Sequence, residues 1–147
     1  SFYCIKKILP IMIIQNYGKI VNVSSTSKFG TINKSNYAAS KAALDALTRT
    51  ISKEVAAHNI TINSVAPTLI DTDMLKTIPT DALSKLVNSS PMKRLGKPEE
   101  IASIIYFLSS DDSSYITKEC DKNEVTIIFL SFFSSIYYIC ASRCYFC

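Results

Sequence analysis

The sequence predicts an α/β fold built on an open, doubly wound parallel sheet. Two short runs rich in β-branched residues, 20–23 and 60–65, flank a longer segment whose apolar residues recur every three or four positions. Short apolar runs of this kind suit buried parallel strands, and the intervening period suits a helix that packs on them. Strand, helix and strand in this order make a βαβ unit.

The elements around the first strand follow from local signals. Residues 2–15 place apolar side chains at helical spacing, and Pro10 predicts that this helix is interrupted. A turn at residues 16–18 leads into the first strand. The helix between the two strands is predicted over residues 36–57, where alanine is frequent.

Two further segments follow the second strand. Pro67 ends that strand, because proline cannot continue a central strand. Residues 68–95 are irregular apart from a short helix predicted at 81–88, and a connection of this length suits a mobile lid over a site. A proline followed by two glutamates then predicts a helix over residues 98–109.

The composition is that of a globular domain, with 147 residues, 48% hydrophobic and 19% charged. The formal net charge of +4 is spread along the chain, which argues against a nucleic-acid-binding surface. The first 117 residues contain only one of the five cysteines, and no signal-peptide pattern is present. We therefore expect an intracellular protein of the cytoplasm or an organelle matrix, not a secreted one.

Three polar side chains fall where a parallel sheet binds ligands. Ser25 lies just past the first strand, and Tyr37 and Lys41 lie four positions apart at the start of the long helix, so they share one face. Ligands of open parallel sheets bind at the carboxyl ends of the strands. These residue types can assist carbonyl reduction, because hydride addition leaves an alkoxide that needs a proton donor.

A tyrosine phenol can be that donor. Ionising a phenol at pH 7 costs roughly 4 kcal/mol, and a lysine ammonium about 5 Å away offsets roughly 3 kcal/mol of that cost. A serine hydroxyl can donate to the substrate oxygen as charge develops. Tyrosine four residues before lysine is common by chance, so the prediction depends on the ordered set of Ser25, Tyr37, Lys41 and the turn at residues 67–72.

Four stretches extend this pattern: GKIVNVSS from Gly18, NYAASKAAL from Asn36, ITINSVAP from Ile60 and KRLGKPEEIA from Lys93. Over residues 2–117 the chain resembles the short-chain dehydrogenase/reductase family. The spacing from Met74 to Arg94 and the run SSYIT from Ser113 are most similar to bacterial-type 3-oxoacyl-[acyl-carrier-protein] reductases. The resemblance implies a Rossmann-like doubly wound sheet, of which residues 1–117 form the incomplete C-terminal, catalytic half.

By this resemblance Tyr37 is the acid/base, Lys41 also holds the nicotinamide ribose hydroxyls, and Ser25 orients the carbonyl. Ser24 is the competing serine, because the family usually places its tyrosine thirteen positions after its serine. Alignment on the strand selects Ser25, with one residue missing from the loop. We prefer Ser25, since strand register fixes side-chain direction whereas loops tolerate deletions.

The turn after the second strand is implied to bind the nicotinamide. Pro67 packs on the ring, and the Ile70 backbone and the Thr72 hydroxyl bind its carboxamide or the adjacent phosphate. Thr68 departs from the family pattern, which commonly has glycine there, although some sugar and carbonyl reductases have threonine. Thr68 therefore makes the identity of the substrate uncertain, whereas the type of reaction is unaffected.

The family's glycine-rich loop, which binds the cofactor pyrophosphate, has no counterpart among the three glycines of the chain. The family's active-site asparagine would precede Phe2. We therefore expect a fragment that lacks roughly a hundred residues, the first βαβαβ half of the fold.

The resemblance stops after Thr117. Residues 118–147 contain four of the five cysteines and an uncharged run of 18 residues, 125–142. We expect this aberrant tail to be the translation of an intron or of a shifted reading frame. A membrane tail anchor is the alternative, because 18 residues reach the lower length of a membrane span. A metal site at the last three cysteines is weakly supported, since no histidine is near.

The full-length parent is expected to be an oxidoreductase that interconverts a carbonyl and a secondary alcohol, with a 3-oxoacyl thioester of fatty acid synthesis as substrate. By resemblance alone, NADP(H) is favoured over NAD(H), acyl carrier protein is a candidate partner, and the parent is a homo-oligomer. A carbonyl, sugar or steroid reductase is the alternative within the family.

A different class of function is a catalytically inactive fragment or pseudo-subunit that pairs with intact copies. The resemblance implies that its first two helices would form the interface, since they commonly do so in the family. Ala42, Ala43 and Ala46 on the second of these would permit close approach. A third hypothesis is a membrane-tethered protein that uses the final segment.

Overall fold

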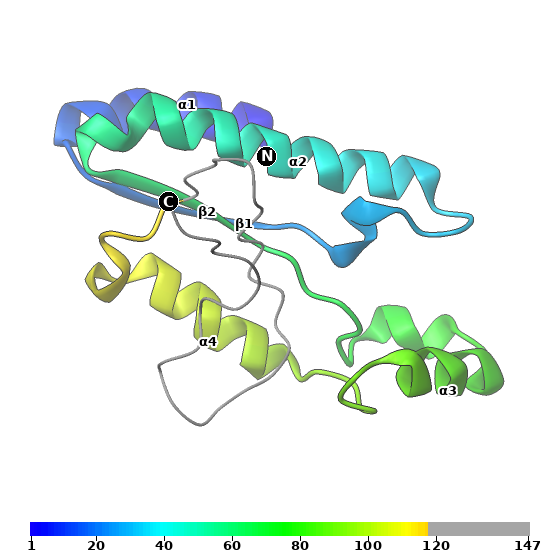
Figure 1. Cartoon of the computed structure of the whole chain (residues 1–147). Coiled ribbons are helices and arrows are strands. Elements are labelled where there is room, and N and C mark those ends of the chain that lie inside the picture. The colour runs from blue at the N-terminus through cyan, green and yellow to red at the C-terminus, as the bar shows by residue number, and fades with distance from the viewer. Residues whose placement is uncertain (118–147) are drawn as a thin grey trace, which may run out of the picture.

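The computed structural model describes residues 1–117. Everything expected of residues 118–147, namely the intron or frameshift origin, the tail anchor and the cysteine cluster, lies outside the described residues. The described part has three layers, with two helices on one face of a small parallel sheet and one helix on the other (Figure 1). A further helix lies past the carboxyl ends of the strands.

The sheet consists of β1 (Gly18–Val23) and β2 (Ile60–Val65), which are parallel and paired in register along their whole length. Helix α2 (Ser35–Val55) connects them, so the predicted βαβ unit is confirmed. β1 begins earlier than the predicted residue 20, at Gly18. A Cβ on Gly18 would lie 2.5 Å from the Met12 sulfur, so only glycine lets the preceding helix approach the strand this closely.

The predicted interruption of the first helix is wrong. Helix α1 (Phe2–Gln15) continues through Pro10 and ends at Asn16, which has a left-handed conformation. Proline removes one helical hydrogen bond, and here Pro10 and the residue four before it, Lys6, are both exposed. Water can therefore satisfy the carbonyl that Pro10 leaves without a donor, and the remaining turns keep the helix intact.

The core lies between α1, α2 and β2, where five aliphatic side chains are buried: Ile5, Ile51, Val55, Ile60 and Ile62. On the opposite face of the sheet, α4 (Pro98–Ser109) buries Leu108, and its bounds are those predicted. Helix α3 (Thr80–Ser89) extends the predicted short helix by one residue at each end.

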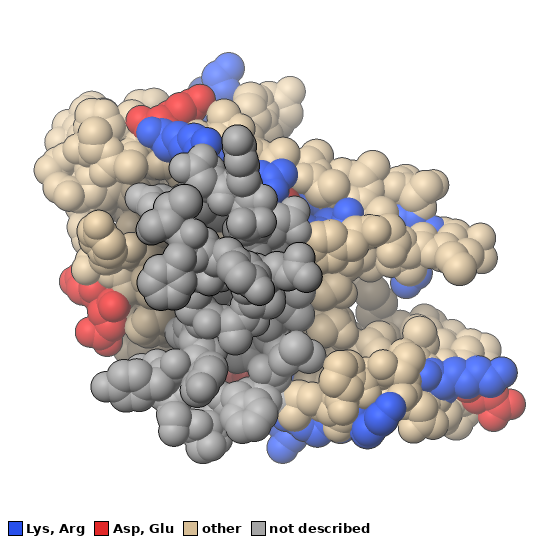
Figure 2. Space-filling model, viewed as in Figure 1, with Lys and Arg blue, Asp and Glu red and all other residues tan. Residues whose placement is uncertain are grey.

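The 3₁₀ helix η3 (Asp73–Thr77) was not predicted. Within the described residues, no helix combines the length and hydrophobicity needed to cross a membrane. On the face shown in Figure 2, basic and acidic side chains are scattered among uncharged ones instead of forming one block.

Candidate active site

The carboxyl ends of β1 and β2 carry two adjacent loops. The Ser24 amide donates to the Val65 carbonyl at 2.7 Å, and the Thr26 amide donates to the Pro67 carbonyl at 3.1 Å. The strand pairing therefore continues past the strands and places the Ser25 loop beside the Pro67 turn. Figure 2 shows a notch at this edge, between the part formed by α2 and the part formed by α3.

The first turns of α2 bring Tyr37 and Lys41 to this edge. The Lys41 Nζ donates to the Val23 carbonyl at 2.7 Å and lies 5.6 Å from the centre of the Tyr37 ring. Tyr37 is 37% exposed, so the residue is accessible from solvent. The structure thus places the lysine cation next to the tyrosine and at the end of the strand that leads to Ser25.

The two candidate serines have different partners. Ser24 is 3% exposed, and its hydroxyl donates to the Lys41 carbonyl of α2 at 3.2 Å. Ser25 is half-buried, and its Oγ accepts a hydrogen bond from the Ser27 amide at 3.2 Å, as the N-cap of the 3₁₀ helix η1 (Thr26–Phe29). The Ser24 proton is therefore already used by the helix backbone, whereas the Ser25 oxygen accepts and its proton can be donated to a ligand.

The turn after β2 exposes a second set of binding groups. Gly96 donates to the Leu69 carbonyl at 2.9 Å and accepts from the Asp71 amide at 2.8 Å, which makes a parallel bridge between Ile70 and Gly96. Because Gly96 bonds to the residues on either side of Ile70, the amide and carbonyl of Ile70 face away from Gly96. They have no hydrogen-bond partner among residues 1–117.

These groups fit the nicotinamide end of a dinucleotide. The Lys41 ammonium can donate to ribose hydroxyls, and an amide with its adjacent carbonyl, as at Ile70, can pair with a carboxamide. Pro67 is half-buried in the same turn, and Thr72 is exposed at its end. None of the three glycines in the chain belongs to a glycine-rich phosphate loop. In residues 1–117, no cluster of three or more His, Cys, Asp or Glu side chains could bind a metal ion.

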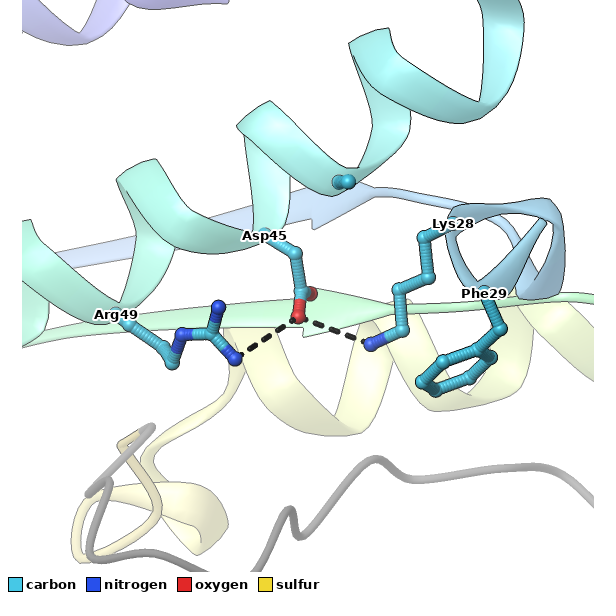
Figure 3. Close-up of a pocket in the computed structure, with 5 residues that line it drawn as sticks. Lys28, Phe29, Asp45 and Arg49 are labelled. Atoms are coloured by element: carbon cyan, nitrogen blue, oxygen red, sulfur yellow. Dashed lines mark hydrogen bonds and ion pairs between the residues drawn. The ribbon is translucent and has the colours of Figure 1, made fainter. Parts of the chain in front are cut away.

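One charged cluster beside the site was not predicted (Figure 3). The Lys28 Nζ lies 2.9 Å from Asp45 Oδ2, the Arg49 guanidinium lies 3.8 Å from the same oxygen, and the Lys28 and Asp45 side chains are each 4% exposed. The Lys28 Nζ also lies 4.9 Å from the centre of the Phe29 ring. This cluster ties η1 to α2 one turn beyond Lys41. The only signal in the sequence is an acid at residue 45 between apolar helix positions.

Comparison with known proteins agrees with this architecture. Residues 1–120 match the family model described as Enoyl-(Acyl carrier protein) reductase. The chain is 45% identical over 117 residues to 3-oxoacyl-[acyl-carrier-protein] reductase FabG of Thermotoga maritima, covering 79% of this chain and 48% of that protein. It is 43% identical over 117 residues to acetoacetyl-CoA reductase of Cupriavidus necator, again covering 79% of this chain and 48% of that protein.

A solved structure shows the same likeness. The crystal structure of levodione reductase matches with a TM-score of 0.75 and 36% identity, covering 79% of this chain and 48% of that chain. The chain spans about half the length of the curated relatives it matches. The two strands and their helices correspond to part of a Rossmann-like sheet, as the sequence predicted. From the family model and these identities, the chain belongs to the short-chain dehydrogenase/reductase family.

Proposed function

We propose that these residues provide the proton-transfer half of an NADPH-dependent reductase that converts the carbonyl of a 3-oxoacyl thioester into a secondary alcohol. The observation that carries this proposal is the position of the Lys41 ammonium, which lies 5.6 Å from the Tyr37 ring and 2.7 Å from the carbonyl oxygen of Val23. This arrangement lies at the carboxyl end of a parallel sheet, where such folds bind their ligands.

The roles of the side chains follow from the donors and acceptors they offer. The reduced nicotinamide, when bound, supplies a hydride to the carbonyl carbon of the substrate. The Ser25 hydroxyl donates to the carbonyl oxygen while negative charge develops on it. The Tyr37 phenol transfers its proton to that oxygen, and the nearby Lys41 ammonium stabilises the phenolate that remains.

Lys41 can serve two partners at once. An ammonium has three donors, so Lys41 can keep its hydrogen bond to the Val23 carbonyl and still donate to ribose hydroxyls. Its partner carbonyl belongs to β1, which is paired with β2 over its whole length. The cation is therefore held by a rigid element, and this favours a reproducible distance to Tyr37.

The substrate class is proposed from the relatives. The printed names of the Thermotoga maritima and Cupriavidus necator relatives specify a 3-oxoacyl-[acyl-carrier-protein] and acetoacetyl-CoA, which are both 3-oxo thioesters. We extend this substrate class to the present protein, with acyl carrier protein as a partner, a homo-oligomeric assembly and an intracellular location. Thr68 supports a sugar or another carbonyl compound as the alternative substrate.

The test uses a joined enzyme, in which residues 1–117 follow the N-terminal half of the Thermotoga maritima relative. We expect it to oxidise NADPH in the presence of acetoacetyl-CoA and to release the 3-hydroxy thioester, with slower turnover on sugar or steroid ketones. NADH is compared under the same conditions. A folded joined enzyme that binds NADPH but reduces none of these carbonyls would show that the proposed function is wrong.

The 147-residue chain by itself is expected to bind NADPH with a Kd weaker than about 10 µM. Residues 1–117 offer contacts only to the nicotinamide end, and the three glycines of the chain form no pyrophosphate-binding loop. Fluorescence titration of NADPH measures this affinity, and the joined enzyme is the control that should bind much more tightly. A Kd clearly tighter than about 10 µM for the chain alone would contradict the assignment of its contacts.

A non-catalytic role as a pairing subunit is supported by the outer surface of the first two helices. Ile5 is the one buried residue of α1, while Ile11 and Ile14 are exposed, as are Ala43 and Ala46 on α2. Mixing the chain with an intact paralogue should then give a hetero-oligomer on size exclusion, with altered reductase activity. If the two proteins elute separately and activity is unchanged, the pairing role is excluded.

A further inference from the structure

The segment of residues 71–95 is closed at its neck. It begins after Ile70 and ends before Gly96, and these two residues are joined outside the sheet by the paired hydrogen bonds of the Ile70–Gly96 bridge. The segment contains η3 and α3 and forms the part of the molecule beyond the strand ends (Figure 1). The Ile70–Gly96 bridge, which we call the neck, therefore fixes both the position of this segment and the position of Ile70.

Gly96 lies between Ile70 and the first turn of α4. A Cβ on Gly96 would lie 2.7 Å from the Ile70 Cδ1 and 3.7 Å from Glu100 Oε2. The first distance is shorter than a normal carbon contact, so the end of the Ile70 side chain packs directly over Gly96 and would have to move for a larger residue. Gly96 is therefore in contact with Ile70 through this side chain as well as through the backbone bonds of the bridge.

Glu100 fixes the chain on both sides of Gly96. Its Oε1 lies 2.6 Å from Arg94 Nη2, and its Oε2 accepts from Arg94 Nη1 at 2.9 Å and from the Lys97 amide at 2.7 Å. Arg94 Nη1 also donates to the Leu95 carbonyl at 2.8 Å. The two-pronged contact restricts the angle as well as the distance between the two side chains.

The same contacts make the pair persistent in acid. The hydrogen bond from Arg94, followed by that from the Lys97 amide, lowers the pKa of Glu100 from 4.5 to about 2. Because the pKa of Glu100 is lower in the folded state than in the unfolded state, its stabilising charge is fully present at any pH above the pKa of the unfolded state. The charge is lost only as the pH falls through the pKa of the folded state. The pKa of Arg94 is raised by the same partner, which agrees with a mutually stabilised pair.

We propose that Arg94 and Glu100 are positioning residues for the nicotinamide end of the site, acting through Gly96 on Ile70. The two side chains hold Gly96 next to α4. Gly96 in turn forms backbone hydrogen bonds with the residues before and after Ile70. The amide and carbonyl of Ile70 are thereby directed to the side opposite Gly96. Neither side chain is assigned a contact with cofactor or substrate. The link to the nicotinamide rests on the proposed function, whereas the link from Arg94 to Ile70 does not.

Hydrogen exchange on the 147-residue chain tests the link to Ile70. The reporters are the Gly96 and Asp71 amides, which form the bridge, and the Ser24 amide is the internal reference in the strand pairing. Arg94→Gln and Glu100→Gln should each lower the protection of the two reporters roughly three- to tenfold and leave Ser24 within about twofold. Arg94→Lys keeps the charge but not the two-pronged contact, and should give an intermediate loss.

A matched control removes another exposed ion pair of the same segment. Lys76 Nζ lies 2.6 Å from Asp73 Oδ1, and Asp73→Asn should leave the protection of Gly96 and Asp71 unchanged. In the wild type, protection of Gly96 should persist to about pH 3 and decline towards pH 2, while Glu100→Gln should show the lowered protection at every pH. Equal protection of Gly96 in the wild type and Glu100→Gln overturns the proposal. So does a loss that extends equally to Ser24.

Kinetics of the joined enzyme test the link to the nicotinamide. Arg94→Gln should lower kcat roughly tenfold and change the KM for NADPH less than about threefold, since misplacing the nicotinamide affects hydride transfer more than overall binding. An unchanged kcat in an active joined enzyme overturns the positioning role and leaves the proposed function standing. An inactive but folded wild-type joined enzyme refutes the proposed function instead, and the exchange result still decides the coupling to Ile70.

Discussion

Tyr37→Phe in the joined enzyme is expected to lower kcat by roughly two to four orders of magnitude, the usual contribution of a positioned general acid. The substitution removes only the phenol hydroxyl and keeps the ring that lies 5.6 Å from the Lys41 Nζ. The affinity for NADPH should therefore stay within about twofold of the parent. A large fall in kcat with little change in cofactor affinity is the signature of a group that acts on the reacting oxygen.

Two comparisons make this result specific. Tyr106→Phe alters an exposed tyrosine of α4, on the other face of the sheet, and should leave turnover unchanged. Lys41→Ala should weaken both turnover and NADPH binding, because the same ammonium is assigned to the phenolate and to the ribose. Steady-state kinetics and fluorescence titration measure the two effects separately. Near-parental turnover of Tyr37→Phe would make the acid/base assignment untenable.

Ser25→Ala is expected to slow the joined enzyme by about a hundredfold, the usual effect of losing one donor to a developing oxyanion. Ser24→Ala should be at least about tenfold faster than Ser25→Ala. The physical reason is the direction of the two hydroxyls. Ser24 donates to the Lys41 carbonyl inside the packed layer, whereas the Ser25 oxygen accepts from the Ser27 amide and keeps its proton for a ligand.

Stability distinguishes the two variants further. Ser24→Ala removes the donor to a helix carbonyl at a buried position and should lower the free energy of unfolding by about 1 kcal/mol. Ser25→Ala removes an N-cap of a short 3₁₀ helix, and its main effect should be on kcat. Thermal or denaturant unfolding measured beside turnover separates these effects. If Ser24→Ala is the slower variant, the thirteen-residue spacing is the correct guide and the strand alignment is wrong.

Much of the fold could be predicted because its signals are local. The β-branched runs at residues 20–23 and 60–65 lie within the observed strands, and the proline with two glutamates predicted the bounds of α4. The prediction failed at Pro10, which lies on an exposed turn where water can satisfy the freed carbonyl, while the packing of other residues such as Ile5 holds the helix in place. It also missed η3, since a single 3₁₀ turn has no periodicity to detect.

For the candidate site, too, local features could be predicted from the sequence and contacts between distant segments could not. The spacing of four between Tyr37 and Lys41 places both on one face of any helix, so the sequence alone could pair them. The roles of Ser25, Tyr37, Lys41 and the turn at residues 67–72 stay predictions until the variants are measured. The sequence alone could not place the Lys41 ammonium on the Val23 carbonyl, because that contact needs β1 beneath α2.

What the sequence by itself determined is therefore the alternation of strands and helices and the order of the polar residues along them. Only the tertiary structure decided which of two neighbouring serines turns into the helix layer, and that Glu100 holds the chain on both sides of Gly96. Hydrophobic period and capping act within a few residues of the chain. The direction of a hydroxyl or the partner of a carboxylate depends instead on groups that packing brings together from distant segments.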